Sequence, residues 1–237
     1  MRVFVIGASS DIGLAVCKIF LANGWNVLAH YRTPRAELSS LAAENYAKVN
    51  LLQLDFSDPA TTEKNLADHR EDYSKCDSMI NCAAFYAPAK FCGITAESLI
   101  EAFTVNTLPG LLVVRDIVPA MAERRWGRIV HLSSIGVKFG GGSQSFSYSL
   151  SKHALEFLPA DHRLWASSNI LLNVLRVGVT DTRIHSHSPS KNMTQRVEMI
   201  PIKRMAEASE IAKAAWFFGS EENSYITGQT VSISGGE

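Results

Sequence analysis

The chain has 237 residues, of which 46% are hydrophobic and 19% are charged, as expected for one compact domain with a sizeable core. Lysine plus arginine and aspartate plus glutamate both total 23, so the formal net charge is zero. This balance argues against a surface that binds nucleic acid or a membrane. Because no internal repeat, low-complexity segment or linker divides the sequence, residues 1–237 are predicted to form a single domain.

The cysteine content and the first residues predict a cytoplasmic location. The four cysteines include neither a CxxC pair nor a zinc-ligand spacing, so we interpret them as reduced thiols and expect no metal site. Because the chain begins with the strand-like run Val3–Ile6 and no small-residue cleavage site follows, we expect no signal peptide. No apolar run approaches the roughly 18 residues that a membrane-spanning helix requires.

Short apolar segments alternate with longer helical patterns along the chain. Strands are expected, in chain order, at Arg2–Ile6, Asn26–His30, Val49–Leu54, Ser78–Asn81, Arg128–Leu132, Ile170–Leu175 and Thr230–Ile233. Helices are expected at Gly13–Asn23, Arg35–Asn45, Pro59–Tyr73, Ala96–Glu123, Ser147–Ser167 and Ala208–Gly219. Apolar strands separated by helices indicate βαβ units around a sheet that is covered on both faces. The predicted fold class is α/β, a Rossmann-like, doubly wound parallel sheet of about seven strands.

Two segments interrupt this pattern. Pro159 has no N–H group and is expected to kink or end the helix that contains it. Residues 183–200 are polar and unpatterned, and a loop this long in a compact domain is typically a functional lid or partly disordered. Its Arg183 and Lys191 would favour a polar or anionic substrate, although surface loops are polar in any case.

A glycine-bearing turn follows the first expected strand. In Gly7-Ala-Ser-Ser-Asp-Ile-Gly13 the glycines allow the backbone to approach a diphosphate closely. The helix that follows directs unpaired N–H groups and a partial positive charge at the same place, and Ser9 and Ser10 add hydroxyl donors. An ordinary strand–helix turn is the alternative, since the spacing differs from the GxGxxG fingerprint.

Polar side chains at three further strand ends extend this predicted nucleotide site. Arg32 follows the second expected strand, where an arginine accommodates a ribose 2′-phosphate and so indicates NADP rather than NAD. A solvated surface arginine is the alternative. Asp55-Phe56 and Asn81-Cys-Ala-Ala84 follow the next two strands, at the edge where open α/β sheets bind ligands.

Tyr148 and Lys152 are spaced by one turn on the same face of an expected helix. An ammonium beside a phenol favours the phenolate, so Lys152 is predicted to lower the pKa of Tyr148 and make it a general acid and base. The same spacing occurs at Tyr86 and Lys90. Pro88 argues against a helix there, so that second pair is not expected to align.

Two more polar residues lie near this pair in the expected fold. Ser134 ends the fifth strand, where its hydroxyl is able to hold a substrate oxygen while Tyr148 supplies a proton; a helix or turn cap is the commoner role of a serine. Asn106 lies inside the expected Ala96–Glu123 helix, although its amide competes with the helical backbone. This unfavourable position suggests a special role for Asn106.

Together these motifs resemble the short-chain dehydrogenase/reductase family, in its compact single-domain branch, over essentially the whole chain. The segments that carry the resemblance are Gly7–Gly13 (TGxxxGxG), Asn81–Ala84 (NNAG), Asn106, Gly127–Ser134, Tyr148-x-x-x-Lys152, Val177–Thr182 (PGxxxT) and Ile226–Gly236. Each motif is weak or moderate when taken by itself. Their common order and spacing make the resemblance strong.

The resemblance implies an NADP-dependent oxidoreductase that transfers a hydride between nicotinamide and a carbonyl or alcohol substrate, most often as a reductase. It implies that Tyr148 donates the proton, Ser134 holds the substrate oxygen, and Lys152 lowers the pKa of Tyr148 and binds the nicotinamide ribose. It also implies that Asn106 positions a water linking Lys152 to solvent, and that Thr182 contacts the nicotinamide amide. The residues expected at the cofactor are Gly7, Ser9, Ser10, Asp11, Ile12, Gly13, Arg32, Asp55, Phe56, Asn81, Ala83, Tyr148, Lys152, Gly178 and Thr182.

Four positions depart from the family pattern. Ile6 and Val177 replace a threonine and a proline, and Ala84 replaces a glycine. Asp11 replaces the middle glycine of the first motif and places a carboxylate near the expected diphosphate. Repulsion would weaken cofactor binding unless Asp11 turns away, for example to cap the following helix.

Other interpretations remain open at this stage. A dinucleotide-binding sensor or scaffold without catalytic activity would have the same fold. A metal hydrolase that uses His185 and His187 would need a third ligand, which the sequence does not show. The resemblance also implies a homotetramer or homodimer that pairs through the Ala96–Glu123 and Ser147–Ser167 helices.

Overall fold

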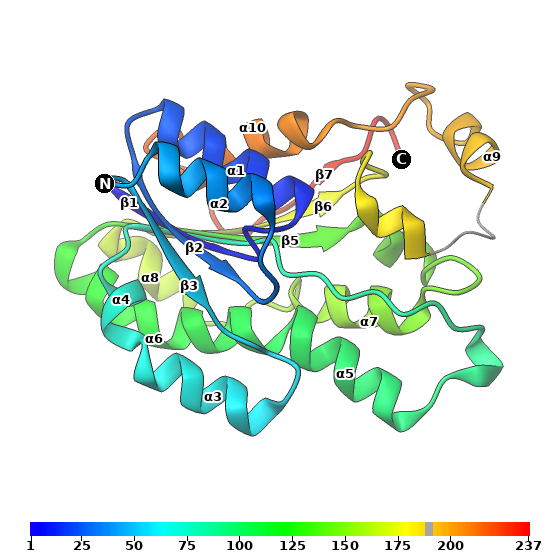
Figure 1. Cartoon of the computed structure of the whole chain (residues 1–237), viewed down its shortest axis with the longest axis horizontal. Coiled ribbons are helices and arrows are strands. Elements are labelled where there is room, and N and C mark those ends of the chain that lie inside the picture. Colours follow the sequence, from blue (N-terminus) through cyan, green and yellow to red (C-terminus); the bar gives the residue numbers. More distant parts are fainter. Residues whose placement is uncertain (188–191) are drawn as a thin grey trace.

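A parallel sheet forms the centre of the computed structural model, which describes residues 1–187 and 192–237. Within these residues seven strands pair in the order β3-β2-β1-β4-β5-β6-β7 (Figure 1). The strands are β1 (Arg2–Ile6), β2 (Asn26–Tyr31), β3 (Val49–Gln53), β4 (Ser78–Asn81), β5 (Gly127–Ser134), β6 (Ile170–Val177) and β7 (Thr230–Ile233). All six pairings are parallel, and the predicted fold class is confirmed.

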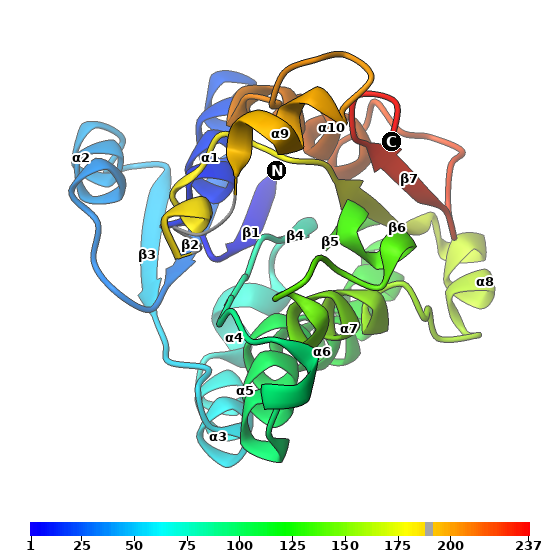
Figure 2. The same ribbon diagram turned by 90° about the vertical axis from the view of Figure 1, so that its right-hand side faces the viewer.

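The apolar strands are buried because helices cover both faces of the sheet (Figure 2). Successive side chains of a strand point to opposite faces, so Val3 and Val5 enter one core cluster while Phe4 and Ile6 enter the other. The helices are α1 (Asp11–Ala22), α2 (Ala36–Glu44), α3 (Pro59–Asp68), α4 (Arg70–Ser74), α5 (Ala96–Asn106), α6 (Leu108–Arg124), α7 (Phe146–Ala154), α8 (His162–Trp165), α9 (Met193–Glu198) and α10 (Ala208–Gly219).

Strand bounds were predicted more accurately than helix bounds. β5 and β6 are longer than predicted because their backbone pairing continues to Ser134 and Val177. This extra pairing holds Ser134 rigidly at the carboxyl edge of the sheet. Ser134 is therefore the last residue of a central strand, in agreement with its expected position at the strand end.

The helix predicted over Ala96–Glu123 is wrong, because the structure breaks it at Thr107 into α5 and α6. Pro109 lies in the first turn of α6, where its missing N–H group is not needed. The whole Ala96–Arg124 stretch is long and apolar enough to cross a membrane, with a mean hydropathy of 1.2 in its most apolar window, contrary to our expectation. Half of that window is buried inside the protein, as in the core helix of a globular domain.

The helices near Pro159 and the segment after β6 differ from the predicted bounds, although an interruption near Pro159 was expected. The predicted Ser147–Ser167 helix is interrupted: α7 ends at Ala154, before Pro159, and α8 begins at His162. The segment expected to be an unpatterned loop contains the 3₁₀ helix η4 (Arg183–His187) and α9. Asn192 caps α9, since its Oδ1 accepts a hydrogen bond from Gln195 N at 3.0 Å.

Candidate active site

A cleft lies over the carboxyl ends of β1 to β4, where the strand order reverses direction between β1 and β4. Ligands bind at this point in open α/β sheets. The cleft has a volume of about 320 Å³. Seven residues predicted at the cofactor line it: Gly7, Ser9, Ser10, Arg32, Asp55, Phe56 and Ala83. His30, Arg35 and Arg183 line it as well, although the sequence analysis did not select them as cofactor ligands.

The glycine turn has the shape that a diphosphate site needs. Gly7 has φ +78°, and a Cβ atom there would lie 2.9 Å from Ala83 N. A Cβ atom on Gly13 would lie 2.2 Å from Gly7 O, so neither position accepts a side chain. Ser10 caps α1, because its Oγ accepts a hydrogen bond from Gly13 N at 3.0 Å and donates one to Gly7 O at 2.8 Å. Ile12 packs against the core below the turn.

His30, at the end of β2, holds this turn in place. Its Nδ1 accepts a hydrogen bond from Gly7 N at 3.1 Å, so its Nε2 carries the proton and donates to Leu54 O at 3.1 Å. The ring also stacks on Phe56 with 4.3 Å between centroids. Burial lowers the pKa of His30 to about 4, which keeps it neutral. A histidine inside an otherwise apolar strand was the sequence signal for this role.

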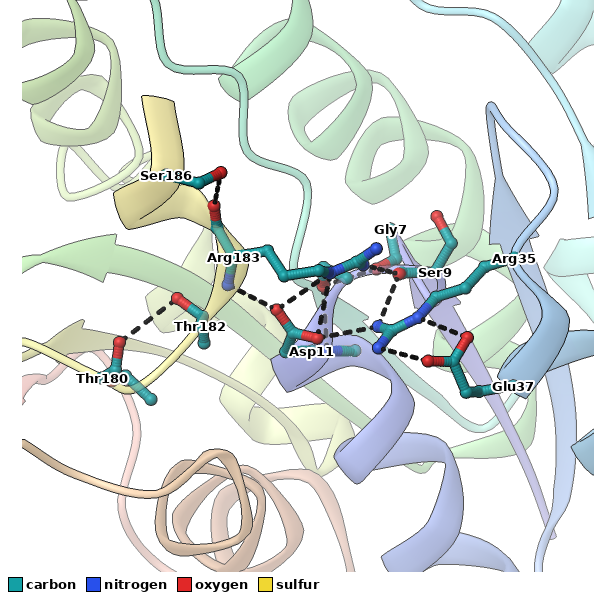
Figure 3. Close-up of polar contacts among 11 residues, drawn as sticks. Gly7, Ser9, Asp11, Arg35, Glu37, Thr180, Thr182, Arg183 and Ser186 are labelled. Carbon is teal, nitrogen blue, oxygen red and sulfur yellow. Dashed lines mark hydrogen bonds and ion pairs between the residues drawn. The ribbon is translucent and has the colours of Figure 1, made fainter. Parts of the chain in front are cut away.

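Asp11 does not cap α1, so the capping role suggested for it is wrong. Its carboxylate instead contacts two arginines at the edge of the cleft (Figure 3). Burial raises the pKa of Asp11, but the backbone hydrogen bond from Arg183 and the charges of Arg183 and Arg35 outweigh burial and lower the pKa overall. The carboxylate that was expected to repel a diphosphate is thus neutralised by its neighbours.

Asn81 lies behind the cleft wall and not on its surface. Its side chain is fully buried, and its Oδ1 accepts a hydrogen bond from Ala83 N at 3.1 Å. Its Nδ2 lies 3.4 Å from His131 Nδ1. Asn81 therefore shapes the turn that presents Ala83 to the cleft, and its predicted contact with the cofactor stays a prediction.

The tyrosine and serine predicted to be catalytic come together at the carboxyl end of β5. A side-chain hydrogen bond joins Tyr148, on α7, to Ser134. Burial raises the pKa of Tyr148 to about 12, although the hydrogen bond from Ser134 lowers it in part. The prediction that Lys152 lowers this pKa is wrong for the protein without cofactor. The reason is that Lys152 directs its ammonium to backbone carbonyls.

Lys152 joins the ends of β4 and β5. Its residue is 2% exposed, and its Nζ donates hydrogen bonds to Ala83 O at 2.7 Å and Leu132 O at 2.8 Å. Burial lowers the pKa of Lys152 to about 8. An ammonium has three donors, so these two bonds leave one donor that no other described residue is seen to use.

Asn106 ends α5 and clamps the segment after β4. Its Oδ1 accepts a hydrogen bond from Phe85 N, and its Nδ2 donates to Phe85 O and to Ser151 Oγ, both at 2.9 Å. This clamp places Tyr86 against Tyr148, with ring centroids 5.6 Å apart and planes at 83°. Tyr86 and Lys90 lie outside any helix, as expected, yet Tyr86 packs on Tyr148.

The turn after β6 runs close to the C-terminal segment. A Cβ atom on Gly178 would lie 2.6 Å from Ser234 Cα, so only glycine lets β6 approach the C-terminal segment this closely. Thr182 Oγ1 donates to Thr180 O at 3.2 Å, just before Arg183. The predicted contact of Thr182 with nicotinamide stays a prediction.

The metal-hydrolase alternative has little structural support. Among residues 1–187 and 192–237, no group of three or more His, Cys, Asp and Glu side chains is arranged to hold a metal ion. His185 Nε2 is instead 2.9 Å from Thr180 O. Lys191 and the side chain of His187, both named in the sequence analysis, lie outside what the structure describes.

Comparisons with known proteins agree with this geometry. A family model described as enoyl-(acyl carrier protein) reductase matches residues 7–237. The 3-oxoacyl-[acyl-carrier-protein] reductase FabG of Escherichia coli is 28% identical over 98% of this chain and 95% of its own length. The acetoacetyl-CoA reductase of Rhizobium meliloti is 29% identical over 98% of this chain and 96% of its own.

Two solved structures show the same fold. YwfH, an NADPH-dependent reductase involved in bacilysin biosynthesis, is 27% identical with a TM-score of 0.86, over 99% of this chain and 97% of that one. A 3-oxoacyl-(acyl-carrier-protein) reductase from Agrobacterium tumefaciens with NADP bound has a TM-score of 0.87 at 24% identity. The match covers 100% of this chain and 93% of that one. On the near-complete match of the family model, the chain belongs to the short-chain dehydrogenase/reductase family.

Proposed function

We propose that this protein is an NADP-dependent reductase of a small-molecule carbonyl substrate, with Tyr148 as general acid. The observation that carries the proposal is the hydrogen-bonded Ser134–Tyr148 pair, one helical turn from Lys152, whose ammonium contacts Ala83 in the wall of the cleft. Relatives that reduce 3-oxoacyl-carrier-protein and acetoacetyl-CoA support a carbonyl group as the reacting centre. The intact Asn106, Ser134, Tyr148 and Lys152 argue against a sensor without catalytic activity.

The cleft fits a phosphorylated dinucleotide. A Cβ atom at Gly7 or Gly13 would collide with neighbouring backbone, so the two glycines keep the turn tight, and α1 begins directly after it with its N-terminus free to attract phosphate. Arg32, on the adjoining rim, supports NADP over NAD because its guanidinium suits a 2′-phosphate. When bound, NADPH supplies the hydride for the carbonyl carbon.

The protein's own residues then handle the oxygen of the substrate. Ser134 donates a hydrogen bond to that oxygen and holds it beside Tyr148. A pKa of about 12 keeps Tyr148 protonated at neutral pH, so it donates its proton to the oxygen as the alcohol forms. The pKa of Lys152 is lowered to about 8, so its ammonium is suited to return a proton to Tyr148 after Tyr148 has donated its own. Asn106 positions this machinery through Phe85 and Ser151.

We also propose a homodimer or homotetramer that pairs through α5 and α7. An apolar groove of about 460 Å³ lies between these helices and includes Ile100, Phe103 and Leu150, which are 60%, 42% and 49% exposed. Burying such a surface against a second copy would remove apolar area from water. The cytoplasmic location remains our interpretation, supported by four free cysteines of which three are buried.

A direct test replaces Tyr148 by phenylalanine, with Tyr225→Phe as the matched control because Tyr225 is 92% exposed. Tyr148→Phe should leave NADPH binding nearly unchanged and lower turnover on a panel of 3-oxoacyl thioesters and ketones by at least about 100-fold. Tyr225→Phe should change neither quantity. Turnover at the wild-type rate in Tyr148→Phe would disprove the role given to this residue.

A further inference from the structure

Asp11 connects three segments that are distant in the sequence. Its Oδ1 lies 2.9 Å from Arg35 Nη1, at the entry to α2, and 3.3 Å from Arg183 Nε, at the start of η4. Its Oδ2 accepts a hydrogen bond from Arg183 N at 2.8 Å across 172 residues of sequence. In Figure 3 both arginine side chains converge on this one carboxylate. A glycine here, as in the family motif, would hold neither of them.

Both guanidinium groups also contact the cofactor turn itself. Arg35 Nη1 and Arg183 Nη2 donate to Ser9 O at 3.1 and 3.0 Å. Arg35 is held further by Glu37, with bonds of 3.0 and 3.1 Å. The side chain of Arg35 is 14% exposed and that of Arg183 is 62% exposed, and both residues line the cleft. Two cations are therefore fixed at the rim where the phosphates of a dinucleotide enter.

The two arginines face different parts of such a ligand. Arg35 follows β2 together with Arg32, on the side of the sheet where the adenosine ribose binds. Arg183 crosses to Ser9 in the turn before α1, where a helix N-terminus attracts a diphosphate. A guanidinium has five N–H donors, and the described bonds leave donors on both groups for a phosphate.

We propose that Asp11 is a positioning residue that assembles Arg35 and Arg183 into a phosphate clamp, with Arg35 on the 2′-phosphate and Arg183 on the diphosphate. The inference rests on the proposed NADP-dependent function and deepens it. The simple electrostatic expectation is that an acid in a phosphate-binding turn weakens binding. The proposal predicts the reverse: removing the negative charge of Asp11 weakens cofactor binding, because Arg35 and Arg183 lose the carboxylate that orients them.

The experiment is a direct binding titration of NADPH and of NADH to the full chain, without substrate. Asp11→Asn keeps the size of the side chain and should raise the Kd for NADPH about tenfold. Arg35→Ala should weaken NADPH about tenfold and leave NADH within about twofold, as should Arg32→Ala. Arg183→Ala should weaken both nucleotides by the same factor, since both contain the diphosphate.

Two controls separate the clamp from other effects. Glu44→Gln removes an exposed carboxylate at the end of α2, outside the clamp, and should change the Kd for NADPH less than about twofold. Hydrogen exchange at the Arg183 amide should become faster in Asp11→Ala, because that amide loses its acceptor. This readout needs no bound nucleotide and tests the positioning role even if a variant binds poorly.

Tighter NADPH binding by Asp11→Asn would overturn the proposal, since the carboxylate would then act only by repulsion. Equal weakening of NADPH and NADH by Arg35→Ala would overturn the assignment of Arg35 to the 2′-phosphate. A wild-type protein that binds neither nucleotide would instead refute the proposed function. The two failures are therefore distinguishable within one set of titrations.

Discussion

Lys152 is expected to make the stability of the cofactor-free protein depend on pH in a specific direction. Burial lowers its pKa from 10.5 to about 8. Protonation of Lys152 is therefore about 3 kcal/mol less favourable in the folded state than in the unfolded chain. The unfolded chain therefore binds this proton more strongly than the folded one. The free energy of unfolding should rise with pH between about 8 and 10.5, since the folded protein is relieved of the buried charge.

The perturbation is Lys152→Met, which keeps the apolar stem and removes the ammonium. At neutral pH the variant no longer buries a charge, but Ala83 O and Leu132 O lose their donor, at a cost of about 1–3 kcal/mol each. These opposing effects should nearly cancel at pH 7. Towards pH 10 the neutral amine of the wild type still donates to both carbonyls. The free energy of unfolding of the wild type should therefore rise by up to about 3 kcal/mol relative to that of the variant.

The assay is urea unfolding of the wild type and Lys152→Met at pH 7, 8, 9 and 10, with Lys138→Met as control because Lys138 is exposed. The control should unfold in parallel with the wild type at every pH. If the free energies of unfolding of Lys152→Met and the wild type changed in parallel with pH, the reasoning would be refuted, since burial would then impose no cost on the ammonium.

Three further predictions concern the parts that support the site. Asn106→Ala removes both hydrogen bonds to Phe85, so the free energy of unfolding measured in urea should fall by about 2 kcal/mol and turnover should fall as well. Unchanged stability would contradict the role of Asn106 as a clamp. Gly7→Ala forces a side chain to within 2.9 Å of Ala83 N at φ +78° and should weaken NADPH binding at least about tenfold in a titration, whereas wild-type affinity would show that the glycine turn adapts. Leu150→Arg places a charge in the α5–α7 groove and should lower the molar mass measured by light scattering; an unchanged mass would exclude this groove as the interface.

Local patterns in the sequence were sufficient to predict the strands of the sheet. The bounds of β1, β4 and β7 match the prediction, because a short apolar run between polar or glycine-bearing ends is a local signal. The glycine turn was recognisable for a similar reason, since Gly7 and Gly13 are sterically required at those positions. The break at Thr107 was missed because the apolar pattern of Ala96–Glu123 runs through it, although Pro109 is a local signal for the start of a new helix.

The order of the motifs predicted which residues are catalytic, but not their electrostatics. The pKa of Tyr148 depends on how deeply packing buries its ring and on where the Lys152 ammonium points, and both depend on residues of other strands. The pairing of Arg35 and Arg183 on Asp11 is equally non-local, with 172 residues between Asp11 and Arg183. Sequence spacing carries the 2.0- and 3.6-residue periods of strands and helices, whereas contacts between distant side chains arise only when the sheet brings its carboxyl ends together.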